Sequence, residues 1–264
     1  MHQARDVNIH EHVVRRTGVT FAEIKSQRVG GESANFVDAL PFVWNKFEQA
    51  GYVTLYAEDG LVGGSGDTFH TDFHGFEQVP VHHYMRPFWK ATADLRTADM
   101  TAPRQRGCLG SLPEYKYMFH YVEEFLSNAS YPGHIPRFAF AFTSGSATTD
   151  PASFDDDLSA WLEHLQRSGV LERTAVIVVG DHGPSFGPRR HTELGKAEER
   201  LPLLVVTLPS WFAEQHSVMM KNLATNRDRL ITPLDVHQML LALLDTADAQ
   251  VSIIRSCSRL SSCL

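Results

Sequence analysis

The sequence has few cysteines, no long apolar run and no block of basic residues. Its three cysteines, Cys108, Cys257 and Cys263, are too few for a disulfide framework, and their odd number leaves at least one outside any intramolecular pair. No apolar stretch approaches the ~20 residues that span a bilayer, and residues 1–16 show no signal peptide because they lack an apolar segment. Without a stripe of Lys and Arg, and with a net charge of −7, the chain is not expected to bind nucleic acid.

The remaining composition is that of an ordinary globular protein. The chain has 264 residues, of which 43% are hydrophobic and 21% charged, and this is enough for one sizeable α/β domain. Residues 1–35 are polar and lack sustained periodicity, residues 36–247 are organised into apolar segments, and residues 248–264 are rich in Ser and Cys. We therefore expect a poorly patterned N-terminal segment, one domain over 36–247 and a disordered tail.

Helical and strand patterns alternate along residues 36–247. The expected helices cover residues 42–50, 114–127, 155–168 and 232–244, and the expected strands cover 52–56, 138–142, 174–179 and 201–208. The last two strands are continuously apolar, as in parallel strands that are buried on both faces. The pattern predicts a three-layer α/β/α fold with a mostly parallel sheet, and a loop-rich stretch over 61–106.

A short polar motif, Gly180–Asp181–His182–Gly183, directly follows the expected strand 174–179. In open parallel sheets ligands bind outside the carboxyl ends of the strands, so Asp181 and His182 are expected to project into such a site. A carboxylate next to an imidazole can hold Zn²⁺, Mn²⁺ or Mg²⁺, and the two glycines let the backbone turn sharply around them. The ordinary alternative is a turn-capping Asp beside a surface His.

The segments around this motif follow the order of a known family. The basic loop and the Glu-Glu-Arg-Leu-Pro segment that come after the motif lead into another apolar strand, as they do in the alkaline-phosphatase-like superfamily. The chain most resembles the DUF229 family of sulfatase-like proteins, over roughly residues 36–245. The segments that carry this resemblance, besides the motif, are Trp44–Phe47, Gly51–Thr54, Tyr56–Asp59, His83–Phe88, Gly187–Pro202 and Leu230–His237.

The resemblance implies hydrolysis of a phosphate or sulfate ester by a Thr, Ser or modified Cys nucleophile with a divalent metal, which is Zn, Mn, Mg or Ca. Asp181 and His182 match the family's downstream metal ligands, and His191 is a looser candidate whose ordinary explanation is an exposed loop residue. The basic side chains of the loop suit an anionic ester substrate; they are Arg189, Arg190 and Lys196. The resemblance also implies an extracellular or secretory location.

Two departures from the superfamily leave the catalytic residue unassigned. Residues 1–40 contain no match to the segment that carries the nucleophile, and Thr17, Thr20 and Ser33 are candidates only by residue type. The loop after strand 138–142 has Asp150 but lacks the His found there in the superfamily. We therefore expect an alkaline-phosphatase-like core that is incomplete on its N-terminal side, in a fragment or divergent copy. The alternative function is an inactive extracellular binding or scaffolding protein.

Other polar residues have simpler explanations than a role in the site. Glu198 and Glu199 could be ligands, but we expect one of them to pair with Arg200 or a neighbouring lysine. Asp59 could face the site, but its ordinary role is to form a turn before Gly60. His237 is expected to be a core or helix-surface residue, and Asp155–Asp157 to be charges at a helix N-terminus. A further group of histidines fits no standard zinc spacing; they are His70, His74, His82 and His83.

Overall fold

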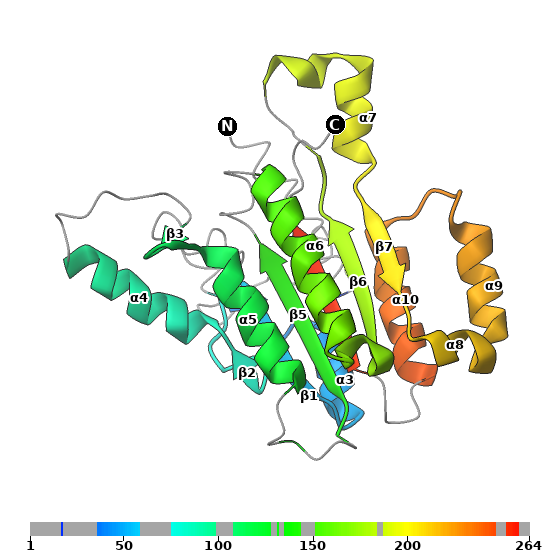
Figure 1. Cartoon of the computed structure of the whole chain (residues 1–264), viewed down its shortest axis with the longest axis horizontal. Coiled ribbons are helices and arrows are strands. Elements are labelled where there is room, and N and C mark those ends of the chain that lie inside the picture. Colours follow the sequence, from blue (N-terminus) through cyan, green and yellow to red (C-terminus); the bar gives the residue numbers. More distant parts are fainter. Residues whose placement is uncertain are drawn as a thin grey trace.

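The chain folds around a six-stranded sheet with the strand order β2-β1-β5-β8-β6-β7 (Figure 1). In this computed structural model the described residues are 17, 36–58, 75–98, 108–127, 131, 135–143, 151–183, 187–246 and 252–258. All neighbouring strands of the sheet run parallel except β6 and β7, which are antiparallel. The prediction of a mixed α/β fold with a mostly parallel sheet is confirmed.

The strands of the sheet are β1 (Val53–Glu58), β2 (His83–Tyr84), β5 (Arg137–Thr143), β6 (Thr174–Gly180), β7 (Leu204–Thr207) and β8 (Ser252–Ser258). A separate two-stranded sheet pairs β3 (Cys108–Leu109) with β4 (Leu112–Pro113). The helices are α3 (Val43–Gln49), α4 (Arg86–Ala98), α5 (Glu114–Ser127), α6 (Pro151–Arg167), α7 (Glu193–Arg200), α8 (Ser210–Gln215), α9 (Ser217–Asn226) and α10 (Pro233–Thr246). Two 3-10 turns, η4 (Val170–Arg173) and η5 (Pro188–His191), follow α6 and precede α7. None of the helices in these ranges is long and apolar enough to cross a membrane.

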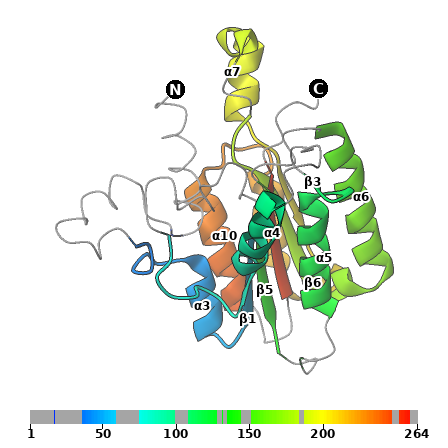
Figure 2. The same cartoon turned by 90° about the vertical axis from the view of Figure 1, so that its left-hand side faces the viewer.

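Helices α3 and α10 lie on one face of the sheet and helices α5 and α6 on the other (Figure 2). Aromatic residues dominate the first face: the Trp44 ring stacks on Phe42 with the ring centres 4.4 Å apart, and on Tyr56 at 5.1 Å. Phe212 of α8 and Leu240 of α10 complete this core. Full burial of one such side chain stabilises the fold by about 1.5–3 kcal/mol. This core therefore holds α3, α8 and α10 against the sheet.

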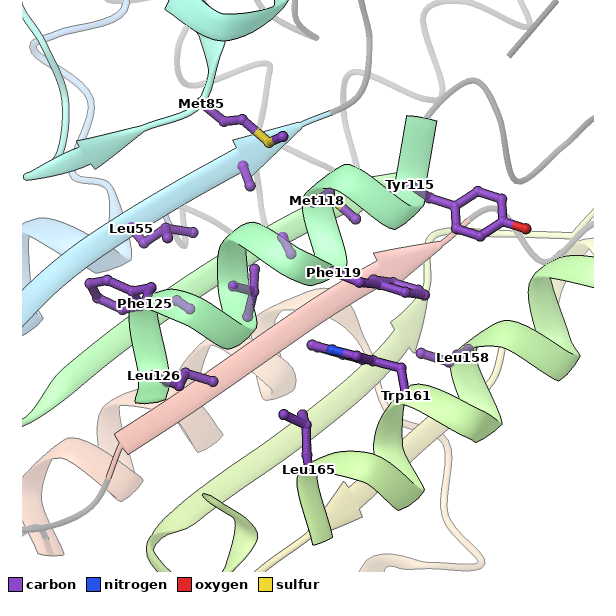
Figure 3. Packing of buried hydrophobic residues seen from close by; sticks show 14 of the residues in the cluster. Leu55, Met85, Tyr115, Met118, Phe119, Phe125, Leu126, Leu158, Trp161 and Leu165 are labelled. Carbon is purple, nitrogen blue, oxygen red and sulfur yellow. The ribbon is translucent and has the colours of Figure 1, made fainter. Parts of the chain in front are cut away.

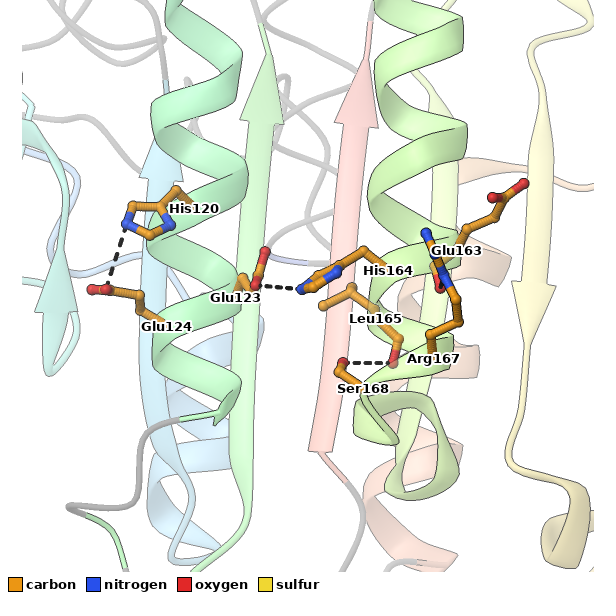
Figure 4. Close-up of polar contacts among 8 residues, drawn as sticks. All are labelled: His120, Glu123, Glu124, Glu163, His164, Leu165, Arg167 and Ser168. Atoms are coloured by element: carbon orange, nitrogen blue, oxygen red, sulfur yellow. Dashed lines mark hydrogen bonds and ion pairs between the residues drawn. The ribbon is translucent and has the colours of Figure 1, made fainter.

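The second core lies between the sheet, α5 and α6 (Figure 3). Phe119 of α5 stacks on Trp161 of α6 with ring centres 4.6 Å apart and rings nearly parallel. Above this core, Glu123 of α5 contacts His164 of α6 at 2.9 Å on the outer surface (Figure 4). An exposed ion pair of this kind contributes little, so apolar packing holds the two helices together and keeps β5 and β6 aligned beneath them.

Strand β7 differs from the buried parallel strand that the apolar run 201–208 predicts. It is antiparallel to β6 and lies at the edge of the sheet, with Leu204 and Val206 packed inward. Leu203 and Val205 are exposed by 47% and 43%. The prediction was wrong because a continuous apolar run occurs in edge strands as well as in central strands. Pro202, which cannot donate a backbone hydrogen bond, is the residue that indicates an edge strand.

The C-terminal segment provides the second correction. Residues 252–258 form β8 in the middle of the sheet, hydrogen-bonded to β5 on one side and to β6 on the other. For these residues the expectation of a disordered tail is wrong. Pairing between strands far apart in sequence decides this element, and local composition rich in Ser does not reveal it.

Two helices also depart from the expected pattern. Helix α4 occupies part of the stretch expected to be loop-rich; Trp89 is its buried aromatic residue, whereas Phe88 is exposed. Helix α6 begins at Pro151, so Asp155–Asp157 lie in its second turn and not at its N-terminus. Asp157 accepts a hydrogen bond from the Tyr115 hydroxyl at 2.8 Å and pairs with Lys116. Its charge therefore joins α6 to α5.

Candidate functional site

Asp181 and His182 lie where β6 ends, at the carboxyl edge of the sheet. β6 is buried along its whole length, because β8 and β7 flank it and helices cover both faces. The chain leaves the strand at Gly180, so the next two side chains fall just outside the hydrogen-bonded part of the sheet. Asp181 is 1% exposed, and His182 is partly buried beside it. The structure thus places the two residues as the sequence predicts.

Hydrogen bonds fix the orientation of both side chains. Asp181 Oδ1 accepts a bond from the His182 backbone N–H at 2.8 Å. His182 Nδ1 lies 2.6 Å from the Gly183 carbonyl oxygen. Because a carbonyl oxygen only accepts, Nδ1 is the donor, and in the neutral ring Nε2 carries the lone pair. A backbone carbonyl on the far nitrogen is the usual support of a metal-binding histidine.

The spacing of the remaining two atoms suits a shared metal ion. His182 Nε2 lies 3.5 Å from Asp181 Oδ2. Two ligands bound at about 2.0–2.1 Å to one tetrahedral ion are separated by roughly 3.4 Å. The imidazole nitrogen and the carboxylate oxygen therefore already have the separation of two ligands on one ion.

Gly183, which directly follows the Asp181–His182 pair, packs against the backbone at the end of helix α7. Its N–H donates to the Glu199 carbonyl oxygen at 3.0 Å. A Cβ atom at position 183 would lie 2.0 Å from the Glu198 carbonyl oxygen, which leaves room only for glycine. Gly195 is equally close to the backbone of Arg189, which packs α7 against η5. Close backbone packing therefore holds the metal-ligand candidates and the following segment as one unit.

The basic residues of η5 and α7 are paired with carboxylates of the same segment. Arg189 lies 3.6 Å from Glu198, Arg190 lies 3.6 Å from Glu199, and Lys196 Nζ lies 2.7 Å from Glu193. Glu198 and Glu199 both form ion pairs, but their partners are the two arginines of η5, so the predicted pairing with Arg200 or a lysine is wrong. All of this segment extends beyond the carboxyl end of β6 (Figure 1).

A cavity of about 1370 Å³ opens beside the Asp–His pair. Asp181, His182 and Arg190 line it, whereas Arg189, His191 and Lys196 do not. His191 is exposed, and it remains only a prediction as a ligand. The structure thus brings three of the six predicted residues to one cavity.

The other residues considered as ligands or nucleophiles do not extend the site. Within the described ranges, no group of three His, Cys, Asp or Glu side chains is placed to hold a metal ion. Thr17 is buried. The remaining candidates lie outside the described residues; they are Thr20, Ser33, Asp59, His70, His74 and Asp150.

Three histidines outside this site have side-chain partners or core positions that explain them without a metal ion. His82 Nδ1 lies 3.0 Å from the Thr54 hydroxyl, and His83 Nε2 lies 2.5 Å from the Tyr131 hydroxyl. Burial and the neighbouring His82 lower the pKa of His83. His237 is buried in α10, as expected of a core histidine. Separate partners for His82 and His83 argue against a common zinc ion.

Sequence reasoning missed two parts of the carboxyl edge. Glu58 is buried at the end of β1 and accepts a hydrogen bond from the Tyr56 hydroxyl. β1 is three strands from β6, a backbone separation of about 14 Å, so Glu58 belongs to a separate region from Asp181. The second missed part is the cavity wall formed by α9 and residues 227–232. The position of Glu58 at a strand end can be read from the sequence, but its burial cannot, and no local pattern indicates the cavity wall.

Comparison with known proteins identifies the family of the chain. No curated protein and no solved structure matches the chain. A family model described as "Protein of unknown function (DUF229)" matches residues 16–263, which extends beyond both ends of the resemblance seen over residues 36–245. The chain therefore belongs to DUF229, a sulfatase-like family.

Proposed function

We propose that this chain is a metal-dependent hydrolase of phosphate or sulfate esters, in which Asp181 and His182 hold the ion. The observation that carries the proposal is the 3.5 Å separation of His182 Nε2 from Asp181 Oδ2, with Nδ1 bonded to a backbone carbonyl. A hydrolase is the coarse function expected of a sulfatase-like family. An alkaline-phosphatase-like core and an extracellular or secretory location form part of the same proposal.

Each side chain of the proposed site has a separate task. Asp181 contributes a carboxylate held in place by the His182 backbone, and His182 contributes the lone pair of Nε2. Zn²⁺, Mn²⁺, Mg²⁺ and Ca²⁺ are all candidate ions, and the imidazole nitrogen favours Zn²⁺ or Mn²⁺ over the other two. A bound ion polarises the ester oxygen and favours attack on the phosphorus or sulfur.

Arginines at the same cavity are suited to the anionic ester group. Arg190 lines the cavity next to the Asp–His pair, and Arg200 lines it at the end of α7. A guanidinium group binds two oxygens of a phosphate or sulfate at once, which orients the ester as well as attracting it. Arg189 and Lys196 remain candidates for a second layer of positive charge around the site.

The test is turnover and metal content measured together. The full chain, supplied with Zn²⁺ or Mn²⁺, is assayed with chromogenic phosphate and sulfate esters, and its bound metal is determined by mass spectrometry. Asp181→Ala is expected to lose the metal and to reduce turnover by at least about a hundredfold. Asp156→Ala, which removes an exposed carboxylate from α6, is the matched control and should leave both readings unchanged.

A second function is favoured by the small number of ligands. Within the described ranges only two side chains meet at the proposed site, whereas catalytic zinc sites have three protein ligands. An inactive extracellular binding or scaffolding protein would retain the fold and the cavity without hydrolysis. Absence of turnover with both ester classes, together with metal content unaffected by Asp181→Ala, would reject the hydrolase and favour this alternative.

A further inference from the structure

The cavity beside the Asp–His pair is apolar over most of its wall. Its inner side is formed by Leu204 and Val206 of β7, Met220 and Leu223 of α9, and Val236 and Met239 of α10. At about 1370 Å³ it exceeds the roughly 300–1,000 Å³ typical of small-molecule sites. A phosphate or sulfate ion alone would leave most of this wall in water.

Charged residues also line the cavity, next to its apolar wall. The register of β6 and β7 pairs Val179 with Leu204, so the start of β7 lies beside the strand end that carries Asp181. Arg190, Arg200, Arg227 and Arg229 all line the cavity, against the two carboxylates of Asp181 and Glu199. The cavity wall therefore combines an excess of cationic side chains with a large apolar part.

Two of these arginines have a carboxylate neighbour within the described ranges, and two have none. Arg190 is paired with Glu199, and Arg227 lies 3.7 Å from Asp228. Among the described residues Arg200 has no carboxylate partner, and the Arg229 guanidinium has none either but donates to the Asn226 side-chain oxygen at 3.2 Å. Apolar side chains sit on the same rim, where Leu201 is 68% and Leu230 82% exposed. The rim thus offers unpaired cations next to bare apolar surface.

We infer that this cavity binds an amphiphilic anionic ester, whose phosphate or sulfate group lies at the Asp181–Arg200 end and whose alkyl or aryl group lies along β7, α9 and α10. This inference rests on the proposed hydrolytic function and names its substrate class. Charge complementarity selects an anion over a neutral or cationic amphiphile. The apolar wall selects a long hydrocarbon group over a simple sugar or inorganic ester.

Binding of alkyl phosphates tests the inference without any need for turnover. Butyl, hexyl and octyl phosphate, below their micellar concentrations, are titrated calorimetrically into the full chain. Each methylene that leaves water is expected to tighten binding roughly fourfold, so octyl phosphate, with four more methylenes, should bind about two-hundredfold more tightly than butyl phosphate. Octanol and octyltrimethylammonium serve as neutral and cationic probes and should bind at least about tenfold more weakly than octyl phosphate.

Paired variants separate the two halves of the cavity. Arg200→Ala should weaken octyl phosphate binding about fivefold to tenfold, whereas Lys221→Ala, on an exposed part of α9 outside the cavity, should not. Leu223→Gln should reduce the dependence on chain length, whereas Val218→Gln, an exposed apolar residue of the same helix outside the cavity, should preserve it. Circular dichroism of each variant confirms that the fold is retained.

The outcomes distinguish this inference from the proposed function. Turnover of chromogenic esters without any chain-length dependence would keep the hydrolase and overturn the amphiphilic substrate. Graded alkyl phosphate binding without turnover would support the ligand class and reject hydrolysis. Equal binding of the cationic amphiphile would overturn the inference, and so would a dimer that Leu223→Gln dissociates, because a second copy of the chain would then occupy the cavity.

Discussion

Gly183 is the residue on which the geometry of the proposed site depends most directly. In Gly183→Ala the added Cβ would lie 2.0 Å from the Glu198 carbonyl oxygen and 2.6 Å from the carbonyl carbon. Backbone atoms cannot rotate away as a side chain can, so we expect a loss of about 3 kcal/mol or more in the free energy of unfolding. Urea denaturation measures this loss, and a metal titration of the same variant measures the displacement of Asp181 and His182.

Gly187→Ala is the comparison that separates close packing from backbone strain. A Cβ at position 187 meets no atom within 4 Å, but its φ of 86° and ψ of 172° suit only glycine. We expect a cost of about 1–3 kcal/mol and little change in metal affinity. Equal loss of metal affinity in both variants would contradict the role given to Gly183.

Tyr52 provides a second test at the residue scale. Its buried hydroxyl has no hydrogen-bond partner among the described residues, and burial raises its pKa to about 12. The folded pKa lies above the unfolded value of about 10, so stability is fully present below pH 10 and declines as the pH rises from 10 to 12. Tyr52→Phe should therefore raise the free energy of unfolding by about 1 kcal/mol at pH 7 and remove this alkaline decline.

Tyr115→Phe is the matched control for that substitution. The Tyr115 hydroxyl donates to Asp157 at 2.8 Å, so its removal should lower the free energy of unfolding by about 1–2 kcal/mol. Urea denaturation at pH 7, 10 and 11.5 compares the two variants. A lower stability of Tyr52→Phe at pH 7 would mean that its hydroxyl has a partner after all.

At the scale of single elements, helix α10 forms one wall of the cavity and begins with a reciprocal cap. The Asp235 carboxylate accepts from the Thr232 N–H at 2.7 Å and from its hydroxyl at 2.5 Å, and Thr232 Oγ1 accepts from the Asp235 N–H at 3.4 Å. The hydrogen bonds from Thr232 lower the pKa of Asp235. Its stabilising contribution is therefore present above the unfolded pKa of about 4 and is lost as the pH falls through the lowered folded value.

Asp235→Asn should remove this acid dependence. We expect the variant to lose about 0.5–2 kcal/mol at pH 7 and to differ little from the wild type at pH 2. Asp245→Asn, which removes an exposed carboxylate near the other end of α10, should be neutral or slightly stabilising because a negative charge there opposes the helix dipole. Thermal unfolding at both pH values measures the difference; an equal loss at pH 2 would contradict a role for the charged cap.

How well the elements can be predicted depends on how local their determinants are. Helix α5 and strand β6 agree with prediction closely, because apolar spacing and a β-branched run decide them. Strand β8 and the orientation of β7 were missed, because both depend on which strand lies alongside. Glu58 was missed as well, since its burial follows from the sheet and not from its neighbours in sequence.

At the scale of the whole molecule, the sheet brings a predictable motif together with an unpredictable cavity. Asp181 and His182 could be predicted, because a buried strand followed by a turn places them at the carboxyl edge. The cavity could not, because its wall combines β7, α9 and α10, and its arginines come from separate segments. The sequence thus indicates the polar end of the site, and only the fold reveals the apolar space that extends from it.

If Asp181 and His182 bind one metal ion together, their contributions to zinc affinity are coupled, and a double-mutant cycle of zinc affinity measures this coupling. Because the chain has 14 histidines, the change in Kd on substitution is the diagnostic quantity. We predict that Asp181→Asn and His182→Gln each raise the Kd for Zn²⁺ at least tenfold, that the double variant is no weaker than the weaker single variant, and that Asp156→Asn has no effect. Unchanged affinity in Asp181→Asn, or independent and additive losses in the double variant, would contradict a shared ion at this site.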